Sequence, residues 1–198
     1  FKTTTQEVGQ LLQADRVAVY RFYPDWSGEF VAEFVTPGWV KLVEGKIKAV
    51  VEDTHLQDSQ GGRYRHNETF TVNDIYQAGH ASCHIALLEQ LQARAYAIAP
   101  IFLGQQLWGL LAAYQNSAPR HWKLGEIKFL AQIANQFGVA LKQADLLEQT
   151  RQQTVELQQA AERERILFDV VAKIRESLDL DTIFQTTAKE VRQSLNAD

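Results

Sequence analysis

The sequence is short of cysteine, the residue that cross-links secreted domains through disulfides and coordinates zinc in most structural sites. Its 198 residues contain one, Cys83. A single thiol can form no internal disulfide, so we expect a chain that works in a reducing compartment, and we predict a cytoplasmic protein or the soluble part of a larger one. No apolar run approaches the roughly 20 residues of a membrane-spanning helix, and the N-terminus carries no signal-peptide pattern, so direct membrane insertion is not expected.

An excess of basic charge is also missing. The formal net charge is −4 and the isoelectric point is near 5.8, which gives no positive field to attract phosphate backbones. Nucleic acid is therefore not expected as a partner. The remaining composition, 45% hydrophobic and 22% charged, is ordinary for a soluble globular protein. The length allows one substantial core with an accessory element, or two small domains.

The two ends of the chain resemble each other. Residues 1–15 align without gaps on residues 184–198, with nine of the fifteen positions identical. Similarity at a fixed period indicates a repeated unit, and here the period equals a whole domain plus a connector. We therefore predict a first domain over residues 1–146, a helical linker over 147–178, and the start of a following repeat over 179–198.

Hydrophobic periodicity inside the first unit alternates between helix and strand. Helical spacing covers residues 1–13, and a helix-like run follows Cys83, whereas residues 40–68 are polar and irregular. Strand patterns occur in two predicted hairpins and one short segment: 16–23 with 29–35, 95–103 with 107–114, and 69–72. This order predicts an α+β fold, an antiparallel sheet with helices on one face and pocket loops on the other. It fits GAF and PAS domains and several unrelated folds.

The character of the sequence changes at Gly125. About fifty residues without proline follow, rich in Gln, Glu, Ala and Leu. A heptad step runs from Leu147 to Val171, but polar residues interrupt the seam and make it a weak coiled coil. We expect a long helix that extends the domain and links repeats, with a possible homodimer through this linker.

The lone cysteine stands between two histidines, in His80-Ala81-Ser82-Cys83-His84. If residues 80–91 are helical, His80, Cys83 and His84 share one face. Structural zinc needs a fourth ligand, and a Cys-His catalytic dyad is disfavoured because adjacent helical residues point about 100° apart. A small buried hydrophobe and permanent attachment of a prosthetic group remain open.

Five segments together carry a resemblance to a known family. They are Val51–Gln57, Gly61–Tyr64, Val72–His80, Cys83-His84 and Gly109–Gln115. In order and spacing they resemble the bilin-binding GAF domains of cyanobacteriochromes, which are phytochrome-related, and most closely the group that interconverts red- and green-absorbing forms. The resemblance covers residues 1 to about 146. It implies a GAF fold and a bound linear tetrapyrrole. Phycocyanobilin is expected, and biliverdin or phycoviolobilin are alternatives because they need similar binding residues.

The resemblance implies a role for each matching residue. Cys83 looks like the thiol that forms a thioether with the first ring, and Asp53 resembles the carboxylate that accepts hydrogen bonds from the pyrrole nitrogens. Arg63 stands where the family pairs an arginine with a propionate, and its planar guanidinium suits a carboxylate. Tyr64 adjoins it in the same motif, and His84 resembles the histidine beneath the pyrroles.

Further positions belong to the same set or depart from it. His80 and Tyr114 resemble groups near the propionates and the photoactive last ring, and Thr54 follows the expected acid. Val51 stands where the red/green group usually has a tryptophan stacked on that ring, so we hypothesise a shifted or weakened green photoproduct. His55 occupies the position of a second cysteine in other lineages, so blue-shifting chemistry through a second thioether is not expected.

The function implied is that of a photoreceptor module. Light would isomerise the last methine bridge, and the long helix would relay the change to an adjacent GAF domain and to an output domain outside this chain, a histidine kinase or a chemotaxis-type domain. The chain itself is not expected to be an enzyme. The alternatives are a GAF module that senses a small molecule such as a cyclic nucleotide, whose Asn-Lys-Phe-Asp-Glu type motif is absent, and a purely structural dimerisation unit.

Overall fold

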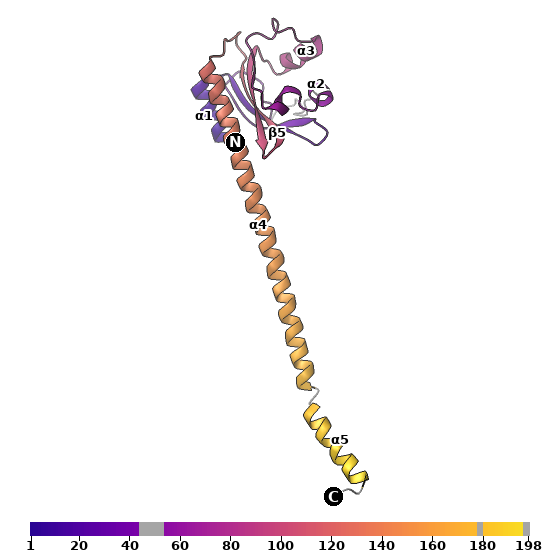
Figure 1. Ribbon diagram of the computed structural model, residues 1–198. Helices are drawn as coiled ribbons and strands as arrows, with labels where there is room; N and C mark the ends of the chain where they lie inside the picture. The colour runs from indigo at the N-terminus through magenta and orange to yellow at the C-terminus, as the bar shows by residue number, and fades with distance from the viewer. Residues whose placement is uncertain (44–53, 178–179, 196–198) are drawn as a thin grey trace. The chain divides into compact units, whose positions relative to one another are not determined.

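An antiparallel sheet forms the centre of the folded part of the chain. The computed structural model describes residues 1–43, 54–177 and 180–195. Among these, five strands pair in the order β2-β1-β5-β4-β3 (Figure 1). Every pairing is antiparallel. The strands are β1 (Arg16–Phe22), β2 (Gly28–Val35), β3 (Phe70–Val72), β4 (Ala95–Leu103) and β5 (Gln106–Gln115).

Both predicted hairpins are confirmed, as is the α+β architecture. The ends of the strands differ from the prediction by at most one residue, and β3 begins at Phe70 instead of residue 69. The central strands are buried on both faces, because alternate side chains of one strand enter two different cores. In β1, Val17 and Val19 face one core, whereas Ala18 and Tyr20 face the other.

Two long helices cover the first face of the sheet. They are α1 (Lys2–Leu12) and the beginning of α4 (Leu124–Ser177), seen side by side against the strands in Figure 1. Their apolar stripes supply Val8, Leu130 and Phe137 to the core. A Cβ at Gly138 would lie 2.2 Å from the Phe102 carbonyl oxygen, so glycine at this position lets α4 approach the backbone of β4.

The second face is covered by short helices and loops. These helices are α2 (Thr54–Asp58), the 3-10 helix η1 (Gly62–His66) and α3 (Ser82–Gln90). The prediction of pocket loops on this face is confirmed, with the addition that the loops contain single helical turns. Such turns pair backbone groups that a covered loop would otherwise leave without hydrogen bonds.

The chain divides into two compact units, Phe1–Ala144 and Asp145–Asp198. The predicted long C-terminal helix is confirmed, since α4 runs without interruption to Ser177, and α5 (Leu180–Ser194) follows. The segment similar to residues 1–15 is thus largely helical, as is its counterpart α1. The finer divisions at 146 and 178 remain predictions. No described helix combines the length and the hydropathy that a bilayer span requires.

Candidate functional site

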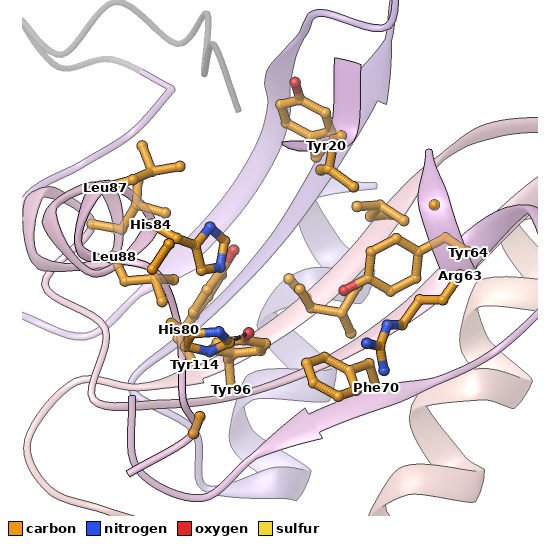
Figure 2. A pocket seen from close by; sticks show the side chains of 18 of the residues that line it. Tyr20, Arg63, Tyr64, Phe70, His80, His84, Leu87, Leu88, Tyr96 and Tyr114 are labelled. Atoms are coloured by element: carbon orange, nitrogen blue, oxygen red, sulfur yellow. Dashed lines mark hydrogen bonds between the residues drawn. The ribbon is translucent and has the colours of Figure 1, made fainter. Parts of the chain in front are cut away.

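A cavity of about 640 Å³ opens on the second face of the sheet (Figure 2). This volume falls within the roughly 300–1,000 Å³ of small-molecule sites. Side chains from β1 to β5, η1 and α3 meet in it, and most of its lining is apolar. The polar and titratable side chains among the lining residues are Tyr20, Arg63, Tyr64, His80, Cys83, His84, Tyr96 and Tyr114.

Cys83 lies in the first turn of α3 and lines this cavity. Its side chain is exposed, so the interpretation of the thiol as a small buried hydrophobe is wrong. The expected helix over residues 80–91 is also wrong at its start. Ala81 is the N-cap, with an extended φ of −62° and ψ of 150°, and His80 therefore precedes the helix.

His80 and His84 nevertheless meet, although His80 lies before the helix. Their ring centroids are 4.7 Å apart with an edge-to-face angle of 68°. Within the described ranges, no group of three His, Cys, Asp or Glu side chains is placed to hold a metal ion. Together with Cys83, the pair offers two imidazoles beside a reachable thiol.

His80 contacts a tyrosine of the sheet. Its Nε2 lies 3.1 Å from the hydroxyl of Tyr96, and the two rings are nearly parallel at 13°. Burial lowers the pKa of His80 below its ordinary value, and the positive charges of His84 and Arg63 lower it further. The folded protein therefore favours a neutral imidazole at this position.

Arg63 and Tyr64 reach the cavity through a bend at Gly61. Gly61 has φ +86°, and a Cβ there would approach the Trp26 ring to 2.8 Å, so the bend depends on glycine. The 3-10 turn that follows places the Arg63 guanidinium 3.8 Å from the Phe70 ring centroid. Tyr64 is buried and its hydroxyl points into the cavity (Figure 2).

Two tyrosines of the sheet form the floor of the cavity. Tyr114, predicted from the sequence, is buried on β5 and pairs in register with Tyr96 on β4, with ring centroids 6.4 Å apart. Tyr96 was not predicted, and neither was Tyr20 on β1. The register of the strands could have identified them, because residues paired across an antiparallel ladder share one face of the sheet.

Part of the predicted site lies outside the described residues. Asp53 and Val51 belong to this part, so their predicted roles are untested. Thr54 begins α2, but its side chain is not among those described, and the same holds for His55. The next residue, Leu56, lines the cavity, so α2 contributes to the cavity wall.

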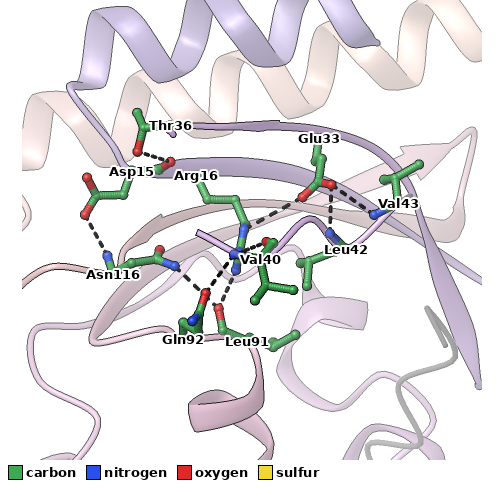
Figure 3. A network of polar contacts seen from close by, with 10 residues as sticks. All are labelled: Asp15, Arg16, Glu33, Thr36, Val40, Leu42, Val43, Leu91, Gln92 and Asn116. Carbon is green, nitrogen blue, oxygen red and sulfur yellow. Dashed lines mark hydrogen bonds and ion pairs between the residues drawn. The ribbon is translucent and has the colours of Figure 1, made fainter. Parts of the chain in front are cut away.

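A buried arginine ties the elements beside the cavity together (Figure 3). Arg16 is fully buried at the start of β1 and donates hydrogen bonds to the carbonyl oxygens of Leu91 and Val40. Its Nε lies 3.8 Å from Oε2 of Glu33, whose Oε1 accepts hydrogen bonds from the backbone of Leu42 and Val43. The end of α3, strand β2 and the segment after β2 therefore share one guanidinium.

Burial lowers the pKa of Arg16, while Tyr114 and Glu33 act in the opposite direction. Tyr114 is its neighbour across the ladder, in the register that pairs β1 with β5. A cation at the C-terminal end of α3 also complements the helix dipole. Arg16 therefore holds α3, the helix with Cys83, against the same strands that form the cavity floor.

Comparison with known proteins places this site in a family. The profile of the GAF domain matches residues 1–141. The structure of the red-light-absorbing state of NpR6012g4, a red/green cyanobacteriochrome, is 63% identical in sequence and superposes with a TM-score of 0.69. The match covers 73% of this chain and 93% of the NpR6012g4 chain. The chain belongs to the cyanobacteriochrome GAF family. The family predicted from the sequence is thus confirmed.

Two further proteins are similar to this chain. The structure of the far-red absorbing dark state of JSC1_58120g3, with bound biliverdin IXa, is 42% identical in sequence and has a TM-score of 0.68. The match covers 73% of this chain and 89% of the JSC1_58120g3 chain. A putative methyl-accepting chemotaxis protein of Synechocystis sp. is 38% identical over 163 residues, 82% of this chain. The chain spans only 16% of the length of that curated relative.

The lowered pKa of His80 predicts how stability depends on pH. The unfolded chain, with a histidine pKa near 6.5, binds a proton at a pH where folded His80 does not. Stability from this group is therefore fully present above about pH 6.5 and is lost as the pH falls below it. His80→Gln should flatten the decline in unfolding free energy between about pH 7 and pH 5, measured by urea titration. His66→Gln, an exposed histidine, gives the background, and an equal decline in both variants would refute the assignment.

The Arg16 network predicts a large difference between two arginines of one strand. Arg16→Ala leaves Glu33 buried without its cation and should lower the free energy of unfolding by about 3–5 kcal/mol. Arg21→Ala removes a half-exposed pair with Glu29 and should cost under about 1 kcal/mol. Urea unfolding followed by tryptophan fluorescence measures both. Similar losses for the two variants would show that the buried network does not hold the fold.

Proposed function

We propose that this chain is a photosensory module whose cavity holds a linear tetrapyrrole joined to Cys83 by a thioether. The observation that carries the proposal is an exposed thiol on the wall of a cavity of about 640 Å³, beside two imidazoles and a guanidinium. Similarity to a red/green cyanobacteriochrome and to a relative with bound biliverdin supports the ligand class.

The described residues fit such a ligand. The apolar lining suits conjugated rings, and the described side chains that line the cavity include Arg63 but no carboxylate. The cavity therefore matches a ligand with acidic side groups, and a propionate is the planar carboxylate that an arginine fork recognises. A thioether forms when the Sγ–H adds across a carbon–carbon double bond, with the proton passing to the neighbouring carbon, so no oxidant is required.

Each residue then has a chemical task. Cys83 holds the ligand permanently, Arg63 neutralises a propionate, and His84 lies one residue from the tether beside the rings. Tyr64 and Tyr114 present phenol groups from η1 and β5, where they can exchange hydrogen bonds when the ligand changes shape. The bound tetrapyrrole would supply a methine bridge that isomerises in light, a group that no amino-acid side chain provides.

The finer assignments belong to the same proposal. We propose phycocyanobilin as the bilin, with biliverdin or phycoviolobilin as alternatives, and interconversion between red- and green-absorbing states. We propose a cytoplasmic module that is not itself an enzyme. It acts through its long helix on an adjacent GAF domain and an output domain, and it forms a homodimer through the linker. The 16% coverage of a chemotaxis protein is consistent with such a context.

A non-photochemical GAF sensor and a structural dimerisation unit share this fold. Neither uses an exposed cysteine on the cavity wall. No feature of the described residues favours them over a covalent photoreceptor.

Removal of the thiol tests the attachment. In cells that also make phycocyanobilin, the unmodified chain should retain colour after denaturation in acidic urea, whereas Cys83→Ala should lose all covalent colour. Ser82→Ala, which changes the exposed neighbour in the same helical turn, should keep the pigment. Absorbance of the denatured polypeptide, normalised to protein, is the measurement. Colour that survives in Cys83→Ala, or is absent from the unmodified chain, would contradict the proposal.

Val51 provides a test of the red/green assignment. Valine cannot stack on a pyrrole ring as tryptophan does, so the green photoproduct should be shifted or weakened relative to that of Trp-bearing relatives. Absorption spectra before and after red illumination measure this. Val51→Trp should bring the photoproduct band toward that of the relatives, and Val51→Ile should not. A normal green product from the unmodified chain would contradict the hypothesis.

A further inference from the structure

Tyr96 is a buried tyrosine that the proposed function does not yet use. Only 3% of it is exposed, on β4 at the floor of the cavity. Its ring lies between aromatic neighbours, with centroids 6.1 Å from Phe70 and 6.4 Å from Tyr114. Packing on both sides and anchorage in a central strand fix the position of its hydroxyl.

That hydroxyl meets a specific atom of His80. The distance from Oη to Nε2 is 3.1 Å, and the two rings are stacked with centroids 6.1 Å apart (Figure 2). The other ring nitrogen, Nδ1, has no hydrogen-bond partner among the described residues. His80 lies in a loop before α3, so its own backbone orients it less firmly than a helix or strand would.

Burial and neighbouring charges together favour the neutral form of His80. Burial comes first, and His84 from α3 and Arg63 from η1 add positive charge, so the pKa of His80 is lowered. Tyr96 and Tyr114 contribute neutral phenols from the sheet. A neutral imidazole has one N–H, and the hydrogen bond at one nitrogen decides which nitrogen carries it.

We propose that Tyr96 is a positioning residue that donates its hydroxyl hydrogen bond to Nε2 of His80 and so directs the N–H at Nδ1 toward a carboxylate of the ligand. This inference rests on the proposed function, because the carboxylate is a propionate of the bilin. Arg63 supplies the charge for this acid, and His80 adds a directed donor. Without Tyr96, the imidazole could carry its proton on Nε2 and turn a lone pair toward the propionate, which would repel it.

The first test needs no ligand. Two-bond ¹H–¹⁵N spectra of ligand-free protein distinguish a protonated from an unprotonated ring nitrogen. We expect the unmodified chain to have His80 protonated at Nδ1 above pH 7, and Tyr96→Phe to shift the population toward the Nε2-protonated form. Tyr76→Phe is the matched control, because Tyr76 is exposed, outside the cavity lining, and bonded through its hydroxyl to Glu89 at 2.8 Å.

The second test asks whether the carboxylate is what His80 recognises. Phycocyanobilin and its dimethyl ester are compared for their rate of attachment to the purified chain. The unmodified protein and Tyr76→Phe should favour the free acid, and in Tyr96→Phe this preference should fall by about three- to tenfold, as expected for one lost hydrogen bond. Damage to the fold alone would slow both ligands equally and leave the ratio unchanged.

Three outcomes would overturn the inference. They are a proton on Nε2 in the unmodified chain, a tautomer that Tyr96→Phe leaves unchanged, and an unchanged preference for the free acid. If the unmodified chain attaches neither ligand, the proposed function fails instead. The tautomer measured without ligand then still decides whether Tyr96 sets the proton of His80, so the two failures are distinguishable.

Discussion

The arrangement of the cavity depends on one buried cation. The guanidinium of Arg16 is removed from water and donates to carbonyl oxygens from two distant parts of the chain, Leu91 and Val40. Desolvation of a charge is costly, and a well-packed apolar group of the same size often serves stability equally well. What an apolar group cannot do is bond several backbone segments in fixed directions. Arg16 therefore stabilises a geometry, because it joins the end of α3 to strand β1 at a set position.

This constraint bears on how the walls of the cavity are held in place. The first face of the sheet is filled by side chains from α1 and α4, with Leu130 and Ala134 fully buried. The second face leaves part of its apolar surface uncovered as the wall of the cavity. The elements that carry this wall are also joined at its edges. Arg16 does this at the C-terminal end of α3, and the bend at Gly61 does it at η1.

Local patterns made most of the fold predictable. The hairpins follow from alternating strands around short turns, and the long helix follows from fifty residues without proline. The site residues came from the family resemblance instead, and the structure brings six of them to one cavity: Arg63, Tyr64, His80, Cys83, His84 and Tyr114. The start of α3 was misplaced because Gly79 and His80 continue a turn with φ +71° at the glycine, which a polar sequence does not distinguish from a first helical turn.

Contacts between distant segments were not predictable. Arg16 follows Asp15 and reads as a solvent-exposed charge at a strand end, because its partners lie 24 and 75 residues away. Tyr96 reads as one more apolar residue of β4, and only the register with β5 shows that it shares a face with Tyr114. Both residues stand within regular strands, where sequence patterns predict burial but not what a buried polar atom bonds to.

Charge balance finally connects the described site to the part of the prediction outside it. The described lining of the cavity provides Arg63 and two imidazoles for acidic groups, and no carboxylate. A protonated bilin is a delocalised cation, and a buried cation requires an acid close by. The described lining alone would therefore leave the rings of such a ligand uncompensated. Asp53, next to Thr54 at the start of α2, is the carboxylate that the family resemblance assigns to the pyrrole nitrogens. The role of Asp53 stays a prediction, and its chemical reason is that propionates and protonated rings carry opposite charges and need opposite partners.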